Sequence, residues 1–211
     1  MKHVSALFAV LSIGFGQASA AEPSIADLAA RTELRGIPTL TVTDQQFLKG
    51  DKDGKPVIIG GELRIPRDVT GKLPAVVLLH GSGGPNGGHE LWAKHFNEMG
   101  IASLLIDSFS ERGIVSTSAN QALLGRLNMI LDAYRGLDLL AIHPRIDATR
   151  VAVMGFSRGG QAALYSSLKR FQEAWTPKAT FALHIPLYAS CTTTFIRDTD
   201  VTAPIRQFHK Q

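Results

Sequence analysis

The sequence predicts an α/β protein whose mostly parallel sheet is covered by helices on both faces. Three observations support this class. From residue 73 onward, short apolar runs alternate with amphipathic segments, as in strands joined by crossover helices. Before residue 73, two strand-like segments flank a turn-rich stretch, which indicates an antiparallel hairpin. Two glycine-rich turns each lie between an apolar run and a helical pattern, so we expect strand-to-helix junctions there.

The N-terminal hairpin is the first element. Residues 21–35 form a mixed lead-in, and residues 37–42 and 57–65 have the composition of two strands. Residues 49–56 are rich in Gly, Asp, Lys and Pro, which favours a turn between these strands.

The alternating part follows. Its elements are expected in the order strand 75–79, helix 90–99, strand 101–106, helix 120–142, and a strand that starts at residue 151. In the long helix the apolar residues share one face: Leu123, Leu127, Ile130, Leu131, Tyr134 and Leu137. A helix whose inner face reaches Leu168 follows the last of these strands. Further strands are expected at 180–187 and 203–208.

Composition indicates a globular chain with a substantial core. Of the 211 residues, 45% are hydrophobic and 19% charged, and we find no repeat or low-complexity linker. We therefore expect one domain over residues 21–211. The formal charge of +4 comes from scattered basic residues, so no nucleic-acid partner is expected.

The first twenty residues have the pattern of a secretory signal peptide. Lys2 precedes an apolar run, and a small-x-small motif ends at Ala20. We expect residues 1–20 to be removed and the mature protein to be periplasmic or secreted. No later run has the ~20 apolar residues of a membrane span, so none is expected after leader removal. A retained anchor is the alternative.

Cysteine and histidine spacing predicts neither a disulfide nor a metal site. Cys191 is the single cysteine, and we expect it to be a buried or half-buried apolar residue. His89 and His95 are six residues apart, whereas two ligands on one helical face are commonly about four apart. No metal or other cofactor is expected.

Ser157 lies at the centre of the most informative motif, VAVMGFSRGGQ at residues 151–161. Gly155 and Gly159 complete a G-x-S-x-G pattern between a buried strand and a helix, which is typical of a nucleophile elbow. Such a turn lifts the hydroxyl out of the sheet, where a base can reach it. A tight turn without chemistry is the alternative.

A second motif, HGSGGPNGG at residues 80–88, holds five glycines in nine residues. We expect the main-chain N–H groups of Ser82 and Arg158 to form an oxyanion hole, which stabilises charge on a carbonyl oxygen during acyl transfer. A phosphate-binding loop is the competing interpretation, but neither of its glycine patterns is present. His80 is expected to brace the loop.

With VVLLHGSGG followed by GFSRGG, the sequence resembles the dienelactone hydrolase family of the α/β-hydrolase fold. The segments LLIDSFSERG and YASC fit this resemblance, which covers residues 73–211. It implies a hydrolase of carboxylic esters or related acyl compounds, with Ser157 as nucleophile and a small-molecule substrate. Dienelactone hydrolase itself has a cysteine in the elbow, so lactone specificity is not implied.

The resemblance also implies an acid after the seventh strand and a histidine after the eighth. Residues 204–209 would be the seventh strand, and only Lys210 and Gln211 follow them. The usual Asp and His are therefore absent, and the sheet is expected to lack its last strand and helix. The chain is either a fragment of a longer product or a degenerate homologue, such as a non-catalytic exported binding protein. A peptidase or acyltransferase on the same fold is a third hypothesis.

Other polar residues have simpler expected roles. His184 lies in an apolar strand and is expected in the core, while His209 could reach Ser157 only if the tail folded across. Asp198 and Asp200 are expected in a solvated turn. Asp107 either faces the active-site edge of the sheet or pairs with Arg112. An apolar component of the pocket is expected from three aromatic residues: Phe109, Phe156 and Tyr188.

Overall fold

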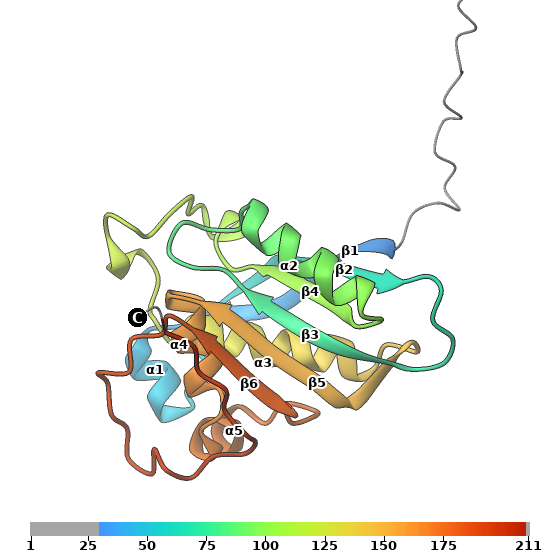
Figure 1. Ribbon diagram of the computed structural model, residues 1–211. Helices are drawn as coiled ribbons and strands as arrows, with labels where there is room; N and C mark the ends of the chain where they lie inside the picture. Colours follow the sequence, from blue (N-terminus) through green and yellow to red (C-terminus); the bar gives the residue numbers. More distant parts are fainter. Residues whose placement is uncertain (1–29, 210–211) are drawn as a thin grey trace, which may run out of the picture.

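The computed structural model describes residues 30–209, so the expected signal peptide at residues 1–20 lies outside the described part. One six-stranded sheet has the order β1-β2-β4-β3-β5-β6 (Figure 1). Its strands are β1 (Ala30–Thr41), β2 (Lys55–Pro66), β3 (Leu73–Leu79), β4 (Ala102–Asp107), β5 (Ile146–Phe156) and β6 (Leu183–Leu187). Strands β3 to β6 are parallel, whereas β2 runs antiparallel to both β1 and β4. This is the mostly parallel sheet with an antiparallel hairpin that the sequence predicts.

The hairpin is longer than expected. Strand β1 begins at Ala30 and not at residue 37, because the supposed lead-in pairs with β2 in an unbroken register from Ala30↔Pro66 to Thr41↔Lys55. The connection also contains helix α1 (Asp44–Lys49), which starts at a capping box between Thr43 and Gln46. The predicted turn therefore forms only the second half of the connection.

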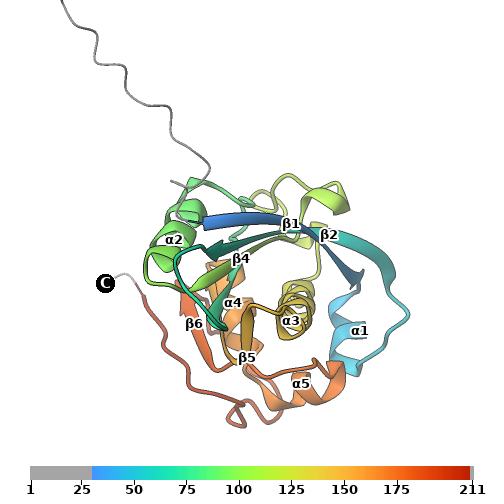
Figure 2. The ribbon, with the colours of Figure 1, turned by 90° about the vertical axis from the view of Figure 1, so that its right-hand side faces the viewer.

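Helices cover both faces of the sheet. Helix α2 (Gly87–Glu98) lies on one face, and α3 (Asn128–Ala141) and α4 (Arg158–Tyr165) lie on the other (Figure 2). Strand β3 is buried between them. Val77 and Leu79 belong to the larger apolar core, and Val76 and Leu78 to the smaller core with Ala93 of α2. Alternation along a strand thus distributes a continuous apolar run between two layers.

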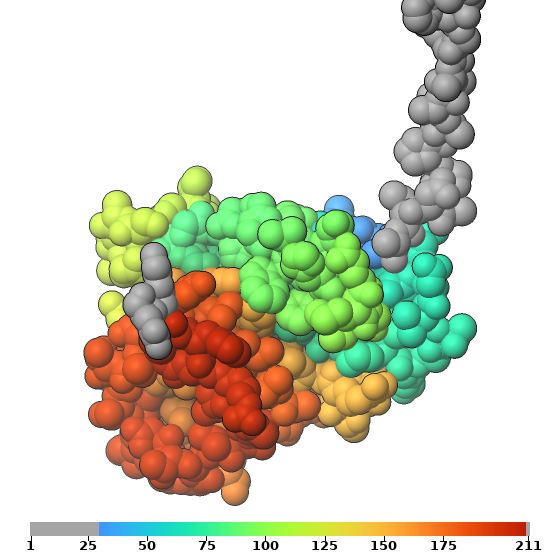
Figure 3. Space-filling view, viewed as in Figure 1, coloured from blue at the N-terminus to red at the C-terminus, as the bar shows by residue number. Residues whose placement is uncertain are grey.

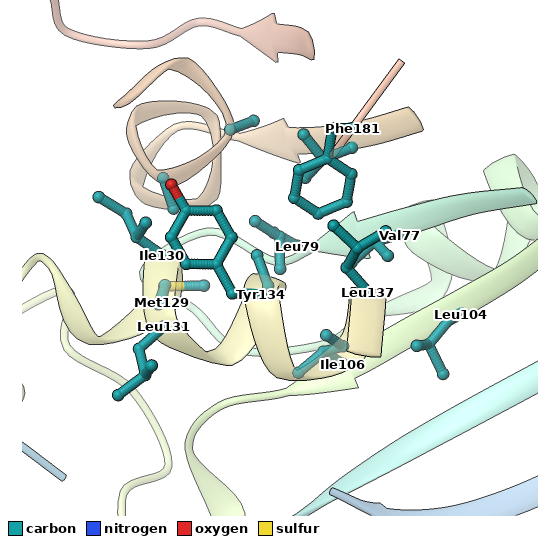
Figure 4. Packing of buried hydrophobic residues seen from close by; sticks show 14 of the residues in the cluster. Val77, Leu79, Leu104, Ile106, Met129, Ile130, Leu131, Tyr134, Leu137 and Phe181 are labelled. Atoms are coloured by element: carbon teal, nitrogen blue, oxygen red, sulfur yellow. The ribbon is translucent and has the colours of Figure 1, made fainter. Parts of the chain in front are cut away.

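Helix α3 supplies much of the larger core. In Figure 4 its Tyr134 and Leu137 lie beside Val77 and Leu79 of β3. The helix begins at Asn128, so the predicted start at residue 120 is wrong. Residues Gln121–Leu123 form a 3-10 helix, and Leu123 is exposed. The carbonyl groups of Gln121 and Leu124 accept hydrogen bonds from Arg158 and not from a following turn of α-helix.

Helix α5 (Lys169–Trp175) was not expected from the sequence. Helix α4 ends at Tyr165, and Leu168 caps the start of α5 and does not extend the helix before it. Phe47 of α1 stacks on Trp175 at 5.2 Å between ring centroids, and Trp175 Nε1 donates to the Phe47 carbonyl at 3.1 Å. These two short helices therefore stabilise each other.

The last described segment runs beside β6. Strand β6 starts at Leu183, three residues later than expected. Within 203–208, single parallel bridges join Ile205 to His184 and Phe208 to Leu187, so the predicted strand has the right place but forms only isolated bridges. Figure 3 shows this segment, in red, on the same face of the molecule as α2. Within residues 30–209, no helix is long and apolar enough to cross a bilayer.

Candidate active site

Ser157 occupies a sharp turn between β5 and α4. Its backbone has φ 52° and ψ −109°, a positive-φ conformation that is costly for a residue with a side chain. The main chain is held there by two hydrogen bonds, from Ser157 N–H to the Leu187 carbonyl (2.8 Å) and from Gln161 N–H to the Ser157 carbonyl (2.9 Å). Ser157 is exposed although its neighbours on both sides are largely buried.

The two glycines of the motif are required by close packing. A Cβ atom on Gly155 would lie 2.0 Å from the Gly159 carbonyl oxygen. A Cβ atom on Gly159 would lie 2.4 Å from the carbonyl oxygens of Leu79 and His80. Real Cβ atoms do not approach backbone oxygens this closely, so the elbow can form only with glycine at both positions.

The glycine-rich loop after β3 lies against the elbow. A Cβ atom placed on Gly81 would lie 3.6 Å from Ser157 Cβ and 3.3 Å from the Phe156 carbonyl oxygen. In the part of the chain that the structure describes, the N–H groups of Ser82 and Arg158 donate to no protein acceptor. The structure therefore places both expected oxyanion donors in segments that meet at Ser157.

His80 braces the loop, as expected. It is fully buried, and its Nε2 accepts from Ser108 N–H at 3.1 Å while Nδ1 donates to the Gly81 carbonyl at 2.7 Å. An imidazole with one donor and one acceptor nitrogen is neutral, and burial lowers the pKa of His80. Because both nitrogens are occupied, His80 is not available as a base for Ser157.

His184 is a core residue, as the apolar strand around it predicts. Its Nδ1 donates to the Ala163 carbonyl at 3.0 Å, and its Nε2 is buried without a protein partner. Burial lowers the pKa of His184 from 6.5 to about 4. This imidazole therefore remains neutral at physiological pH and faces the interior.

The buried imidazole predicts a specific pH dependence of stability. The folded pKa of His184 lies below the unfolded value, so its contribution is complete above about pH 6.5 and is lost as the pH falls from 6.5 towards 4. The difference corresponds to about 3 kcal/mol. In His184→Leu, the free energy of unfolding, measured with urea at several pH values, should fall less steeply between pH 6.5 and 4 than in the wild type.

The test compares how steeply the free energy of unfolding changes with pH in the variant and in the wild type. A loss of stability that the substitution causes at every pH does not affect this comparison. The Ala163 carbonyl keeps a partner in His184→Leu because Ser166 Oγ also donates to it at 3.0 Å. His80, His89 and His143 also have lowered pKa values through burial and contribute equally to both proteins. Identical slopes in the variant and the wild type would contradict the assignment.

The acidic residue after β4 is occupied within its own loop. Asp107 accepts hydrogen bonds from the N–H groups of Phe109 (2.8 Å) and Ser110 (3.1 Å). Burial by itself would raise the pKa of Asp107, but the hydrogen bonds from Ser110 and Phe109 bring it below its ordinary value. The alternative pairing with Arg112 is wrong: Arg112 binds the buried Asp132 of α3 through two hydrogen bonds of 2.8 and 2.9 Å.

The three aromatic residues expected in the pocket have different environments. Phe109 is buried against His80, with the ring centroids 4.4 Å apart, so it is unavailable to a substrate. Phe156 is half-buried beside the elbow, and Tyr188 is 56% exposed at the end of β6. Only the latter two residues can contribute apolar surface near Ser157.

Residues of the last segments lie on the surface. Cys191 is exposed, so the expectation of a buried or half-buried residue is wrong; the extended chain after β6 leaves it uncovered. Asp200 pairs with Arg197 at 2.6 Å in the expected solvated turn, where Asp198 is also exposed. His209 is exposed and its Nε2 contacts Gln207, and no hydrogen bond to Ser157 is formed.

A pocket of about 280 Å³ opens beside α4. Its lining is mainly apolar and includes Ala162, Tyr165 and Phe195, with Gln161 one helical turn after Ser157. A larger pocket of about 640 Å³ lies over β1 and β2 and extends to Pro85 and Asp107. Neither pocket is lined by Ser157 itself. Among residues 30–209, no cluster of three or more His, Cys, Asp or Glu side chains could hold a metal ion.

Comparison with solved structures relates this architecture to known hydrolases. A dienelactone hydrolase-like promiscuous phosphotriesterase from metagenomic libraries has a TM-score of 0.62 and 19% identity, over 84% of this chain and 68% of that protein. A putative dienelactone hydrolase from Klebsiella pneumoniae has a TM-score of 0.59 and 12% identity, over 83% and 72%. The esterase Est22 has a TM-score of 0.53 and 24% identity, over 76% and 44%.

No protein-family model matches the sequence, and the search of curated proteins finds no match either. The identities to the solved structures are low, so these likenesses establish the fold and not the reaction. The chain therefore has the α/β-hydrolase fold.

Proposed function

We propose that the protein is a serine hydrolase that cleaves carboxylic esters or related acyl compounds through an acyl-enzyme on Ser157. One observation carries the proposal: an exposed serine with a strained, positive-φ backbone adjoins the glycine-rich loop, in which the Ser82 N–H has no protein acceptor among the described residues. Strain of this kind persists where function requires it. The names of the similar structures, which include dienelactone hydrolases and an esterase, support the same chemistry.

The geometry supports the following steps. Ser157 Oγ attacks the acyl carbon, and the carbonyl oxygen becomes an oxyanion that accepts from the N–H groups of Ser82 and Arg158. The C–O bond to the alcohol then breaks, the alcohol takes up a proton, and water hydrolyses the acyl-enzyme. Each oxyanion donor typically contributes about 10²- to 10³-fold to the rate. A base must also accept the serine proton.

A non-catalytic binding protein is the second candidate, and the surroundings of Ser157 favour it. Within residues 30–209, no carboxylate or imidazole is hydrogen-bonded to the Ser157 hydroxyl. A site with an oxyanion hole but without a base accelerates the reaction only about 10³- to 10⁴-fold over the reaction in water. Such a protein would bind acyl compounds and turn them over very slowly.

Reaction with a fluorophosphonate tests the proposal. Ser157 Oγ should form a bond to phosphorus with loss of fluoride, the hydroxyl proton passing to solvent, and mass spectrometry of tryptic peptides should locate the adduct on Ser157. The Ser157→Ala variant should carry no adduct there and should not hydrolyse p-nitrophenyl esters. A matched control, Thr149→Ala, removes an exposed hydroxyl near the start of β5, at the end of the strand away from Ser157, and should react like the wild type.

The outcomes separate the candidates. An adduct together with ester turnover that depends on Ser157 supports the hydrolase. An adduct without turnover supports the binding protein, and the absence of an adduct on Ser157 contradicts the proposed nucleophile. Parallel assays with peptides, and with alcohols as acyl acceptors, distinguish an esterase from a peptidase or an acyltransferase.

We also propose that the protein is exported to the periplasm or beyond, with residues 1–20 as the signal peptide. The support is the sequence pattern, in which Lys2 precedes an apolar run that ends before Ala18-Ser19-Ala20. Expression of the full chain in a Gram-negative host, followed by fractionation and intact-mass measurement, should give a periplasmic species that begins at Ala21. A species in the cytoplasm that retains residue 1 would contradict export.

A further inference from the structure

We propose that Gln121 is a positioning residue that holds both main-chain donors of the oxyanion hole in place, an inference that rests on the proposed hydrolase function. Its side-chain amide lies between Ser82 and Arg158. Gln121 Nε2 donates to Ser82 Oγ at 3.0 Å, and Gln121 Oε1 accepts from Arg158 Nη1 at 2.9 Å. A single amide thus connects the two residues whose N–H groups have no protein acceptor among the described residues.

The Arg158 side chain makes this connection firm. Arg158 is 3% exposed, and within the described residues no carboxylate pairs with it. Burial lowers the pKa of Arg158, because desolvation disfavours the charged form. Its acceptors are the Gln121 carbonyl at 3.0 Å, Gln121 Oε1 and the Leu124 carbonyl. A buried cation that relies on one short segment for its hydrogen bonds holds that segment tightly.

The loop that contains Gln121 also holds the main chain of Ser82, through residues 116 and 117. The Ser82 carbonyl accepts from Thr117 N–H at 2.8 Å and from Ser116 Oγ at 3.1 Å, while the Ser82 hydroxyl contacts Gln121. The flanking residues Gly81 and Gly83 have no side chains that could make such contacts. The position of the Ser82 N–H therefore depends on residues 116–121, which follow β4 and belong neither to the elbow nor to the glycine-rich loop.

This arrangement has a kinetic consequence. An oxyanion donor is effective when it lies about 2.7–3.1 Å from the developing charge, so a small displacement weakens charge stabilisation more than it weakens binding. In Gln121→Ala both side-chain hydrogen bonds are lost, so the direct link between the two donor segments is removed, while the main-chain hydrogen bonds to Arg158 and Ser82 remain. In Gln121→Glu a carboxylate oxygen can still accept from Arg158 and from the Ser82 hydroxyl, so the link is retained.

Fluorophosphonate kinetics test the proposal, because the phosphonyl oxygen takes the place of the acyl oxyanion. For Gln121→Ala we expect the maximal rate constant of Ser157 modification to fall about 10- to 100-fold, with the half-saturating concentration little changed. Gln121→Glu should recover to within about threefold of the wild type. The matched control is Gln172→Ala on α5, which removes a side-chain contact to Thr180 and should leave the rate unchanged.

Hydrogen exchange gives a readout that does not require reactivity. Peptides that cover residues 81–84 and 156–160 should exchange faster in Gln121→Ala than in the wild type, and Gln121→Glu should restore protection. A wild-type protein that reacts, together with a Gln121→Ala variant that reacts at the same rate, would overturn the positioning role. If the wild type does not react, the proposed function fails, and unchanged exchange in Gln121→Ala would then overturn the role of Gln121 separately.

Discussion

Gly159→Ala is expected to destabilise the protein by about 4 kcal/mol or more, because the new methyl group has no space. Its Cβ would lie 2.4 Å from two carbonyl oxygens and 2.7 Å from the Leu79 carbonyl carbon. All three atoms belong to the main chain at the end of β3, where no rotamer change relieves the contact. Overpacking typically costs about 1–3 kcal/mol where neighbours adjust, and more where the neighbour is a backbone in the centre of a sheet.

Urea unfolding measures this effect, with Gly83→Ala as the matched control. Gly83 lies in the glycine-rich loop, and a Cβ atom added there would meet nothing within 4 Å. The control should therefore change the free energy of unfolding by less than about 1 kcal/mol. If Gly159→Ala were as stable as Gly83→Ala, the close approach of α4 to β3 would be wrong, and the position of the loop beside Ser157 would be wrong with it.

Asp132→Ala is expected to cost about 3–5 kcal/mol, because it leaves the Arg112 guanidinium buried without its partner. The side chains of Arg112 and Asp132 are 4% and 0% exposed, and Asp132 also accepts from Thr39 Oγ1 at 3.0 Å. Arg112 donates in addition to Thr41 Oγ1 and to the Leu40 carbonyl. The pair thus joins the loop after β4 to α3 and to β1, and its loss affects three elements.

Two further variants test whether burial accounts for the size of the effect. Glu173→Ala removes the exposed pair with Arg197, which water already solvates, so its unfolding curve should be nearly superimposable on that of the wild type. The double variant Arg112→Met/Asp132→Leu removes both charges and should recover most of the lost stability. A double variant as unstable as Asp132→Ala would show that the contacts of the two side chains matter, and not the unpaired charge.

The sequence predicted the central strands and the elbow because these features depend on local order. An apolar run such as residues 75–79 predicts a strand buried on both faces, whichever helices cover it. The glycines on either side of Ser157 mark a turn that only residues without side chains permit. His184 could be assigned to the core for the same reason, since a polar residue inside an apolar strand shares the burial of its neighbours.

The short helices could not be predicted in this way. Helices α1 and α5 have six and seven residues, too few to be stable alone, and they form because Phe47 packs on Trp175 across 128 positions of the chain. The start of α3 depends equally on a distant group. The periodicity of apolar residues predicted that this helix begins at residue 120. The Gln121 and Leu124 carbonyls instead accept hydrogen bonds from Arg158, and α3 begins at Asn128.

Around Ser157 too, some features follow from neighbouring residues in the sequence and others only from the folded chain. The residues alone predicted the strand, the turn and the exposed serine, because the apolar run and the glycine spacing are local features of the sequence. The partner of Arg112, the exposure of Cys191 and the link through Gln121 required the folded chain. A hydrogen bond or an ion pair joins whichever groups the fold brings within about 3 Å, and the separation of two residues along the sequence does not determine that distance.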